Sequence, residues 1–190
     1  MRSFDQRSHT YQGYVLGLRG TVDDEEREFI VALGEAAQAE HQIAAGDRVM
    51  GAGVRVADPR TEIAELYKVS ALRVFERRAS PSSVAPPWSH VTPTLEVYGE
   101  RGPRRLDART YDTKCATCTW GARMAVELVI DQWDRNRAPR YRVESFCYGP
   151  LSCRLYKAGA TRKVPGRNGM SWEEEDWIDE DTVRHRGPDE

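Results

Sequence analysis

The sequence is short of several features that would point to a class of protein. It has only 4 cysteines and 4 histidines in 190 residues, and none of its apolar runs approaches the ~20 residues of a membrane-spanning helix. Its first residues, MRSFDQRSHTYQG, lack the apolar core of a secretory signal, so we expect a cytoplasmic protein without a membrane partner. A chain of this length buries a core without crosslinks, so its few cysteines are not required for folding.

Familiar catalytic motifs are also missing. The sequence contains no GxSxG, HExxH, GxGxxG or P-loop pattern, which are the usual marks of hydrolases and nucleotide-binding enzymes. The histidines stand in separate segments, with no second histidine or cysteine beside them at the spacing of metal ligands. We therefore assign no catalytic residue, and the sequence favours a non-catalytic protein.

Strand patterns dominate the first hundred residues. These segments are rich in valine, tyrosine and leucine, and several alternate apolar with polar side chains. We predict strands over residues 11–22, 27–34, 46–56 and 67–77.

Two glycines suggest how these strands are arranged. Gly51 and Gly53 interrupt the third strand, which is typical of a bulge or a barrel corner. The succession HQIAAGDRVMGAGVRV and YKVSALRVFER resembles the barrel strands of OB-fold proteins as a general pattern. That resemblance implies a small antiparallel OB-like barrel over residues 10–98.

The second half of the chain predicts a separate module. Residues 79–93 contain four prolines and four serines, so we expect a linker there. A strand is predicted at 94–98, followed by a hairpin of strands 124–133 and 140–148. The fold class is therefore mainly β, with residues 99–170 forming a four-cysteine metal-binding hairpin module.

The last segment, residues 171–190, predicts an acidic helix and tail. Ser171 and Glu174 have the spacing of a capping box, and acidic residues follow in the first turn, where the helix dipole favours them. We expect a short helix over about residues 172–180.

The four cysteines occur in two clusters, Cys115-x2-Cys118 and Cys147-x5-Cys153. A two-residue gap lets both sulfurs face one ion, which is why such pairs recur in zinc and iron–sulfur sites. The hairpin is predicted to turn near residue 136, which sets Cys147 opposite about residue 126, so that residues 119–123 must loop back to return Cys118 to the site. Zinc is the favoured cofactor, and an iron–sulfur cluster, or free thiols or disulfides, are the alternatives.

Charge is unevenly distributed along the chain. Residues 101–167 hold 15 Lys/Arg against 6 Asp/Glu, whereas residues 168–190 hold 2 against 9. Aromatic side chains lie among the cations, and cations beside rings are what a surface for single-stranded nucleic acid requires. The candidate nucleic-acid-binding residues are Trp120, Arg135, Arg137, Arg140, Arg142, Tyr148, Arg154, Lys157, Arg162, Lys163 and Arg167.

Three functions follow from these observations. The preferred one is a metal-stabilised protein that binds single-stranded DNA or RNA, in which the acidic tail competes with nucleic acid or docks a protein partner. The second is an accessory or interaction subunit of a larger complex. The third is an iron–sulfur redox or enzyme subunit.

Overall fold

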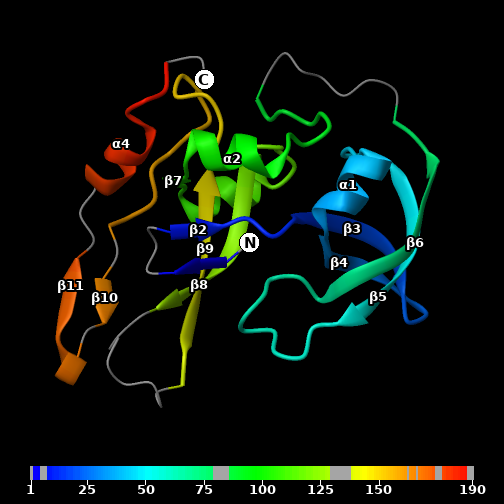
Figure 1. Ribbon diagram of the computed structural model, residues 1–190, viewed down its shortest axis with the longest axis horizontal. Helices are drawn as coiled ribbons and strands as arrows, with labels where there is room; N and C mark the ends of the chain where they lie inside the picture. The colour runs from blue at the N-terminus through cyan, green and yellow to red at the C-terminus, as the bar shows by residue number, and fades with distance from the viewer. Residues whose placement is uncertain are drawn as a thin grey trace.

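A computed structural model of the chain describes residues 2–4, 8–78, 86–128, 138–161, 163–165, 167–173 and 177–187 (Figure 1). The fold is mainly β, as the sequence predicts. The two larger sheets have four and five strands. Figure 1 shows them next to each other, with α2 near the five-stranded sheet and α1 beside the four-stranded one. No helix in the described part of the chain is long and apolar enough to cross a membrane.

The four-stranded sheet has the order β3-β4-β6-β5. Its strands confirm the four predicted in this region, and they are β3 (Tyr14–Val22), β4 (Glu25–Leu33), β5 (Arg48–Arg55) and β6 (Leu66–Glu76). Strands β3 and β4 are joined by Asp23 and Asp24, whose positive φ values of 50° and 65° suit a tight hairpin turn. Helix α1 (Glu35–His41) connects β4 to β5.

The predicted OB-like barrel is wrong, because this sheet does not close within the residues that the structure describes. Strands β4 and β6 pair in parallel at a single position, Val31 with Leu66, and β3 and β5 remain the two edges. The predicted bends are confirmed, since the register of β5 against β6 shifts on either side of Ala52, where Gly51 and Gly53 stand. These glycines therefore bend an edge strand without turning a barrel corner.

The five-stranded sheet has the order β2-β1-β8-β9-β7. Strands β8 (Gly121–Leu128) and β9 (Arg140–Cys147) pair antiparallel, which confirms the predicted hairpin as far as the described residues reach; residues 129–133 of its first predicted strand lie outside them. The other members are β1 (Arg2–Phe4), β2 (Ser8–Thr10) and β7 (Arg104–Arg105). Strand β1 pairs in parallel with β8, so the start of the described chain belongs to the sheet that carries the cysteines.

One hydrophobic cluster contains residues from both large sheets and from α2 (Leu95–Arg101). Its buried members are Tyr14, Leu33, Ile43, Leu95, Tyr98, Met124, Val126, Phe146 and Tyr148. The two sheets therefore share apolar contacts across the predicted boundary at residue 98, and the division of the chain into 10–98, 99–170 and 171–190 stays a prediction.

The strand predicted at 94–98 is wrong, because this segment forms α2. Leu95 and Tyr98 are buried on one helical face, whereas Glu96 and Glu100 are exposed. The helix ends at Gly102, whose φ of 68° favours glycine.

The acidic C-terminal segment is partly packed against the protein. Its predicted helix starts late, because residues 171–173 form β11 (Ser171–Glu173) against β10 (Lys163–Pro165), and α4 spans Trp177–Val183. Glu174 of the predicted capping box lies outside the described residues. Val183 and Arg186 are buried, and a Cβ atom on Gly102 would lie 2.6 Å from Cγ2 of Thr182. The end of α4 is therefore docked beside β7.

Candidate metal centre

The ends of the strands bring the four cysteines together. The single-turn α3 (Ala108–Thr110) and the π-helical turn η1 (Tyr111–Cys115) lead to Cys115, and Cys118 follows in a turn closed by its own N–H bonding the Cys115 carbonyl at 3.0 Å. Cys147 is the last residue of β9. Cys153 follows in a turn in which its N–H bonds the Pro150 carbonyl at 3.1 Å.

The register of the hairpin differs from the prediction. Cys147 lies opposite Gly121, the first residue of β8, and not near residue 126. Cys118 is only three residues before Gly121, so it reaches the site without looping back. On its other side Cys147 lies opposite Arg104 of β7, which places the end of β9 between two neighbouring strands.

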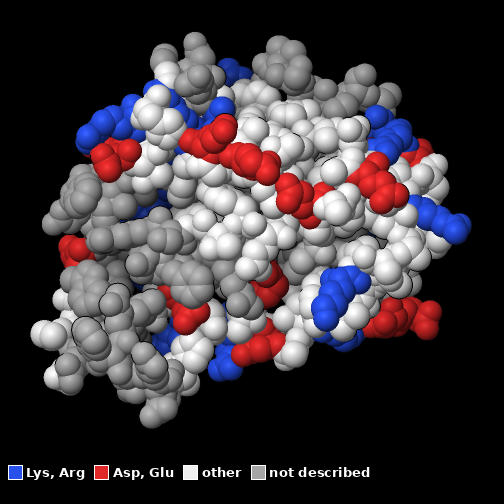
Figure 2. Space-filling view, in the orientation of Figure 1, with Lys and Arg blue, Asp and Glu red and all other residues white. Residues whose placement is uncertain are grey.

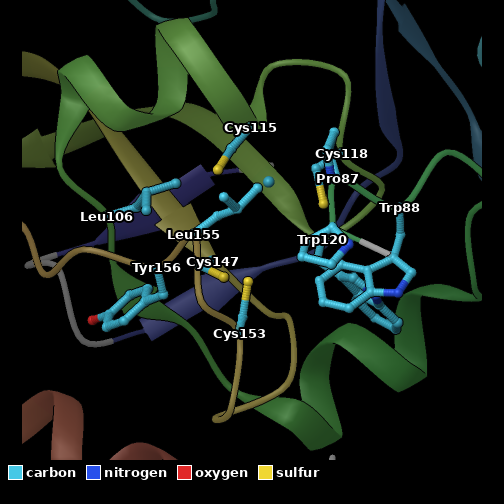
Figure 3. A pocket seen from close by; sticks show the side chains of 12 residues that line it. Pro87, Trp88, Leu106, Cys115, Cys118, Trp120, Cys147, Cys153, Leu155 and Tyr156 are labelled. Atoms are coloured by element: carbon cyan, nitrogen blue, oxygen red, sulfur yellow. The ribbon is translucent and has the colours of Figure 1, made fainter. Parts of the chain in front are cut away.

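All four cysteines line one cavity (Figure 3). Cys115 and Cys147 are buried, Cys118 and Cys153 are half-buried, and all four are free thiols. Figure 3 shows their sulfur atoms directed into the space between the loops. The rest of the lining is Pro86, Pro87, Trp88, Leu106, Trp120, Gly121, Leu155 and Tyr156.

The thiols share this cavity without forming a closed ligand set. Within the described part of the chain, no three cysteine, histidine, aspartate or glutamate side chains are grouped closely enough to hold a metal ion. Zinc–sulfur bonds of about 2.3 Å in a tetrahedron require sulfurs about 4 Å apart. Binding of a single ion therefore requires the sulfur atoms to lie closer together than they do here.

Two of these cysteines accept hydrogen bonds at sulfur. The Gly149 N–H donates to Cys147 Sγ at 3.4 Å, and Arg104 donates to the same sulfur at 3.7 Å. Backbone N–H groups of Trp120 and Trp88 donate to the Cys118 sulfur. Donors of this kind surround metal-bound thiolates and orient them.

The cavity opposes ionisation when no cation is present. Burial raises the pKa of the Cys115 thiol to about 11, and negative charge on Cys118, Cys147 and Cys153 acts in the same direction. Burial also raises the pKa of Cys118, although the two backbone donors act against it. A bound cation reverses both effects, because it is attracted to each thiolate and screens the thiolates from one another.

Tyr148 does not lie at a binding surface, which corrects its predicted role. Its side chain is fully buried in the core, and its hydroxyl is hydrogen-bonded to His9 Nδ1 at 2.8 Å. The ring of Trp120 is half-buried and has the Arg101 guanidinium 4.5 Å from its centroid. A base cannot stack on Tyr148 in this fold, and one face of Trp120 is already covered.

The predicted cations lie in different environments. Arg142 is paired with the buried Glu144 at 2.6 Å, so its charge is already engaged. Arg140, Arg154, Lys157 and Lys163 are exposed. Three predicted cations, Arg135, Arg137 and Arg162, lie outside the described residues, as does the side chain of Arg167. Among the described residues on the face shown in Figure 2, basic and acidic side chains are interspersed without an extended basic patch.

Residues that the sequence did not single out complete the site. Trp88 lines the cavity from the segment predicted to be a linker, and Arg104 contacts a cysteine sulfur from β7. Neither residue stands at a recognisable spacing from a cysteine, so only the fold associates them with the site. Comparisons of the chain with protein-family models, with curated proteins and with solved structures found no match.

Proposed function

We propose that Cys115, Cys118, Cys147 and Cys153 bind one zinc ion and that the protein is a non-catalytic, metal-stabilised binder of single-stranded nucleic acid. The observation that carries the metal assignment is that all four thiols line one cavity. Four thiolates fill the tetrahedral coordination of zinc and leave no position for water or substrate. The metal would then link the end of β9 to the loop before β8.

An iron–sulfur cluster is the alternative occupant. A four-iron cluster also takes four cysteines and is stabilised by surroundings that exclude water. The tryptophan, leucine and proline side chains around these thiols supply such surroundings. The two occupants differ in colour, because the cluster absorbs visible light and zinc does not.

Metal analysis of the purified protein tests the assignment. We expect about one zinc per chain, no visible absorption after aerobic or anaerobic purification, and loss of the metal when any of the four cysteines is replaced by serine. Ala116→Ser is the matched control, because Ala116 is exposed between two of the cysteines and should leave the metal bound. A folded wild type without metal, or retention of the metal by all four serine variants, would overturn the assignment.

The nucleic-acid proposal is supported by a groove next to the cavity. Trp88 and Arg154 line this open groove together with Pro86, Pro150 and Ser152, and Cys153 lies between the groove and the cavity. An aromatic ring beside an exposed guanidinium suits a stacked base and its phosphate. Trp88 therefore replaces Tyr148 as the proposed stacking residue.

Further cations lie on the neighbouring loops. A hydrogen bond from the Thr110 side chain lowers the pKa of Asp107, and the charges of Lys157 and Arg109 lower it further, so both cations lie near this carboxylate. Both are exposed. Both belong to segments that carry cysteines, and the nearby Asp107 carboxylate offsets part of their positive charge.

A salt titration of binding to single-stranded DNA and RNA tests this part of the proposal. We expect Trp88→Ala to weaken binding at least severalfold, because stacking is worth about 1–3 kcal/mol per base. Arg154→Glu should weaken binding and reduce its salt dependence. Arg73→Glu is the matched control, because it makes the same charge change at an exposed position of β6.

Two outcomes would overturn the nucleic-acid assignment. One is no binding by wild type at micromolar protein and about 50 mM salt, where phosphate contacts are strong. The other is an equal loss of affinity in Arg154→Glu and Arg73→Glu. Either result would leave the metal site standing and favour an interaction subunit.

A further inference from the structure

Three arginines from separate elements converge on the chain that follows Cys147. Arg101 at the end of α2 donates through Nε to the Tyr148 carbonyl at 2.5 Å. Arg104 of β7 donates to the carbonyls of Gly149 and Pro150 at 3.2 and 3.0 Å. Arg186, which follows α4, donates to the carbonyls of Tyr148 and Gly149, both at 3.2 Å. Three cations thus surround three successive peptide groups next to a candidate metal ligand.

Of the three arginines, Arg104 has the surroundings in which a nearby negative charge would stabilise the guanidinium group most. Its side chain is buried, and the side-chain contacts described for it do not include a carboxylate. Its partners are two carbonyl oxygens, the Cys147 sulfur and the Tyr156 ring, whose centroid is 3.9 Å from its guanidinium carbon. A buried cation beside neutral groups is costly, whereas four thiolates around a zinc ion carry a net charge of about −2.

The positive charge of the arginines reaches Cys147 through a peptide group that lies between them. The Tyr148 carbonyl accepts from Arg101 and Arg186, and the N–H of the same peptide group, that of Gly149, donates to Cys147 Sγ at 3.4 Å. Because guanidinium groups polarise the peptide group they bond, they strengthen the hydrogen bond from its N–H to the Cys147 sulfur.

We propose that Arg101, Arg104 and Arg186 are the charge-balancing and positioning groups of the metal–thiolate centre, and that Arg186 couples metal binding to the docking of residues 177–187. The inference rests on the proposed metal site. Arg186 is buried and belongs to the C-terminal segment, so its bonds to Tyr148 and Gly149 exist only while that segment is docked. By linkage, metal binding strengthens the docking by the same factor as docking strengthens metal binding.

Competition with a chelator measures the effect of Arg186 on metal affinity. Partners of metal ligands typically alter metal affinity 10–100-fold when removed, so Arg186→Gln should weaken zinc binding about tenfold. Arg184→Gln is the matched control, because Arg184 is exposed in the same segment and pairs only weakly with Asp181 at 3.2 Å. It should bind zinc as wild type does.

Limited trypsin digestion of unmodified protein tests the reverse direction, and it does not depend on the folding of a variant. Zinc removal should accelerate cleavage after Arg184 and Arg186, and zinc should restore the protection. Cleavage after Arg60, which is exposed in the loop between β5 and β6, should change little and serves as the internal control.

The results separate this inference from the proposal on which it rests. Wild type that binds zinc, with equal affinity in Arg186→Gln and with C-terminal cleavage that zinc does not change, would overturn the coupling and leave the metal site intact. Wild type that binds no metal would overturn the proposed function and this inference together.

Discussion

Gly121 offers a test of the cavity that leaves every thiol in place. It starts β8 opposite Cys147, and the backbone of Cys115 lies against its Cα. A Cβ atom at this position would lie 2.6 Å from the Cys115 carbonyl oxygen and 3.5 Å from the Cys115 Cβ. The contact is with backbone, so a side-chain rotation cannot relieve it. Gly121→Ala must therefore shift the loop that holds Cys115.

The close contact between an added Cβ atom and the Cys115 backbone sets the expected loss of stability in Gly121→Ala. Overpacking of a filled site costs typically 1–3 kcal/mol in the free energy of unfolding. Gly20→Ala is the matched control, because Gly20 is in β3, has no atom within 4 Å of an added Cβ and lacks a positive φ. Replacing a glycine in such an open position stabilises a protein by about 0.4–1 kcal/mol through the unfolded state. The two variants should therefore differ by about 1–4 kcal/mol in the free energy of unfolding.

Urea unfolding and chelator competition on both variants measure this difference. We expect Gly121→Ala to unfold at lower urea and to lose zinc more readily than wild type, because Cys115 moves away from the other thiols. Gly20→Ala should retain zinc fully. If the two variants are equally stable and hold zinc equally well, Cys115 does not pack on Gly121 and the arrangement of the cavity is refuted.

Two further predictions concern the thiol and tyrosine groups of the core. Burial raises the pKa of Cys115 to about 11, so this thiol stabilises the metal-free fold fully below about pH 9 and loses that contribution as the pH rises toward 11. Urea midpoints of metal-free protein should then fall more steeply over this range in wild type than in Cys115→Ser, and parallel curves would contradict the assignment. Tyr148→Phe removes the hydroxyl bonded to His9 and should lower the free energy of unfolding by about 1–3 kcal/mol without changing affinity for nucleic acid. Weaker nucleic-acid binding with unchanged stability would instead place Tyr148 at the binding surface.

Local patterns in the sequence predicted local structure well. Alternating side chains identified β3, β4, β8 and β9, and the glycines at 51 and 53 marked the irregular register of β5. The sequence wrongly predicts a strand at residues 94–98, because Leu95 and Val97 alternate as in a strand. The decisive spacing is that of Leu95 and Tyr98, which lie one helical turn apart and are both buried. A short apolar segment carries both signals, and tertiary packing chooses between them.

The candidate site could be predicted only in part from the sequence, for a different reason. The spacing of the cysteines predicted one common site, and the structure brings all four to one cavity. Sequence could not place Tyr148, because an aromatic residue beside a cysteine is equally suited to a core and to a binding surface. It also could not reveal Arg104 or Arg186, whose relation to Cys147 depends on strand register and on the docking of α4.

The parallel pairing of β1 with β8 sets an order of events in folding. Ser3 lies opposite Val126, and the whole of the four-stranded sheet intervenes between them in the chain. The hairpin of β3 and β4 closes over a two-residue turn, so it forms early, whereas β1 must wait for a partner more than a hundred residues away. During refolding in pulsed hydrogen exchange, the amides of β3 and β4 should gain protection first, and those of β1 should be among the last to do so.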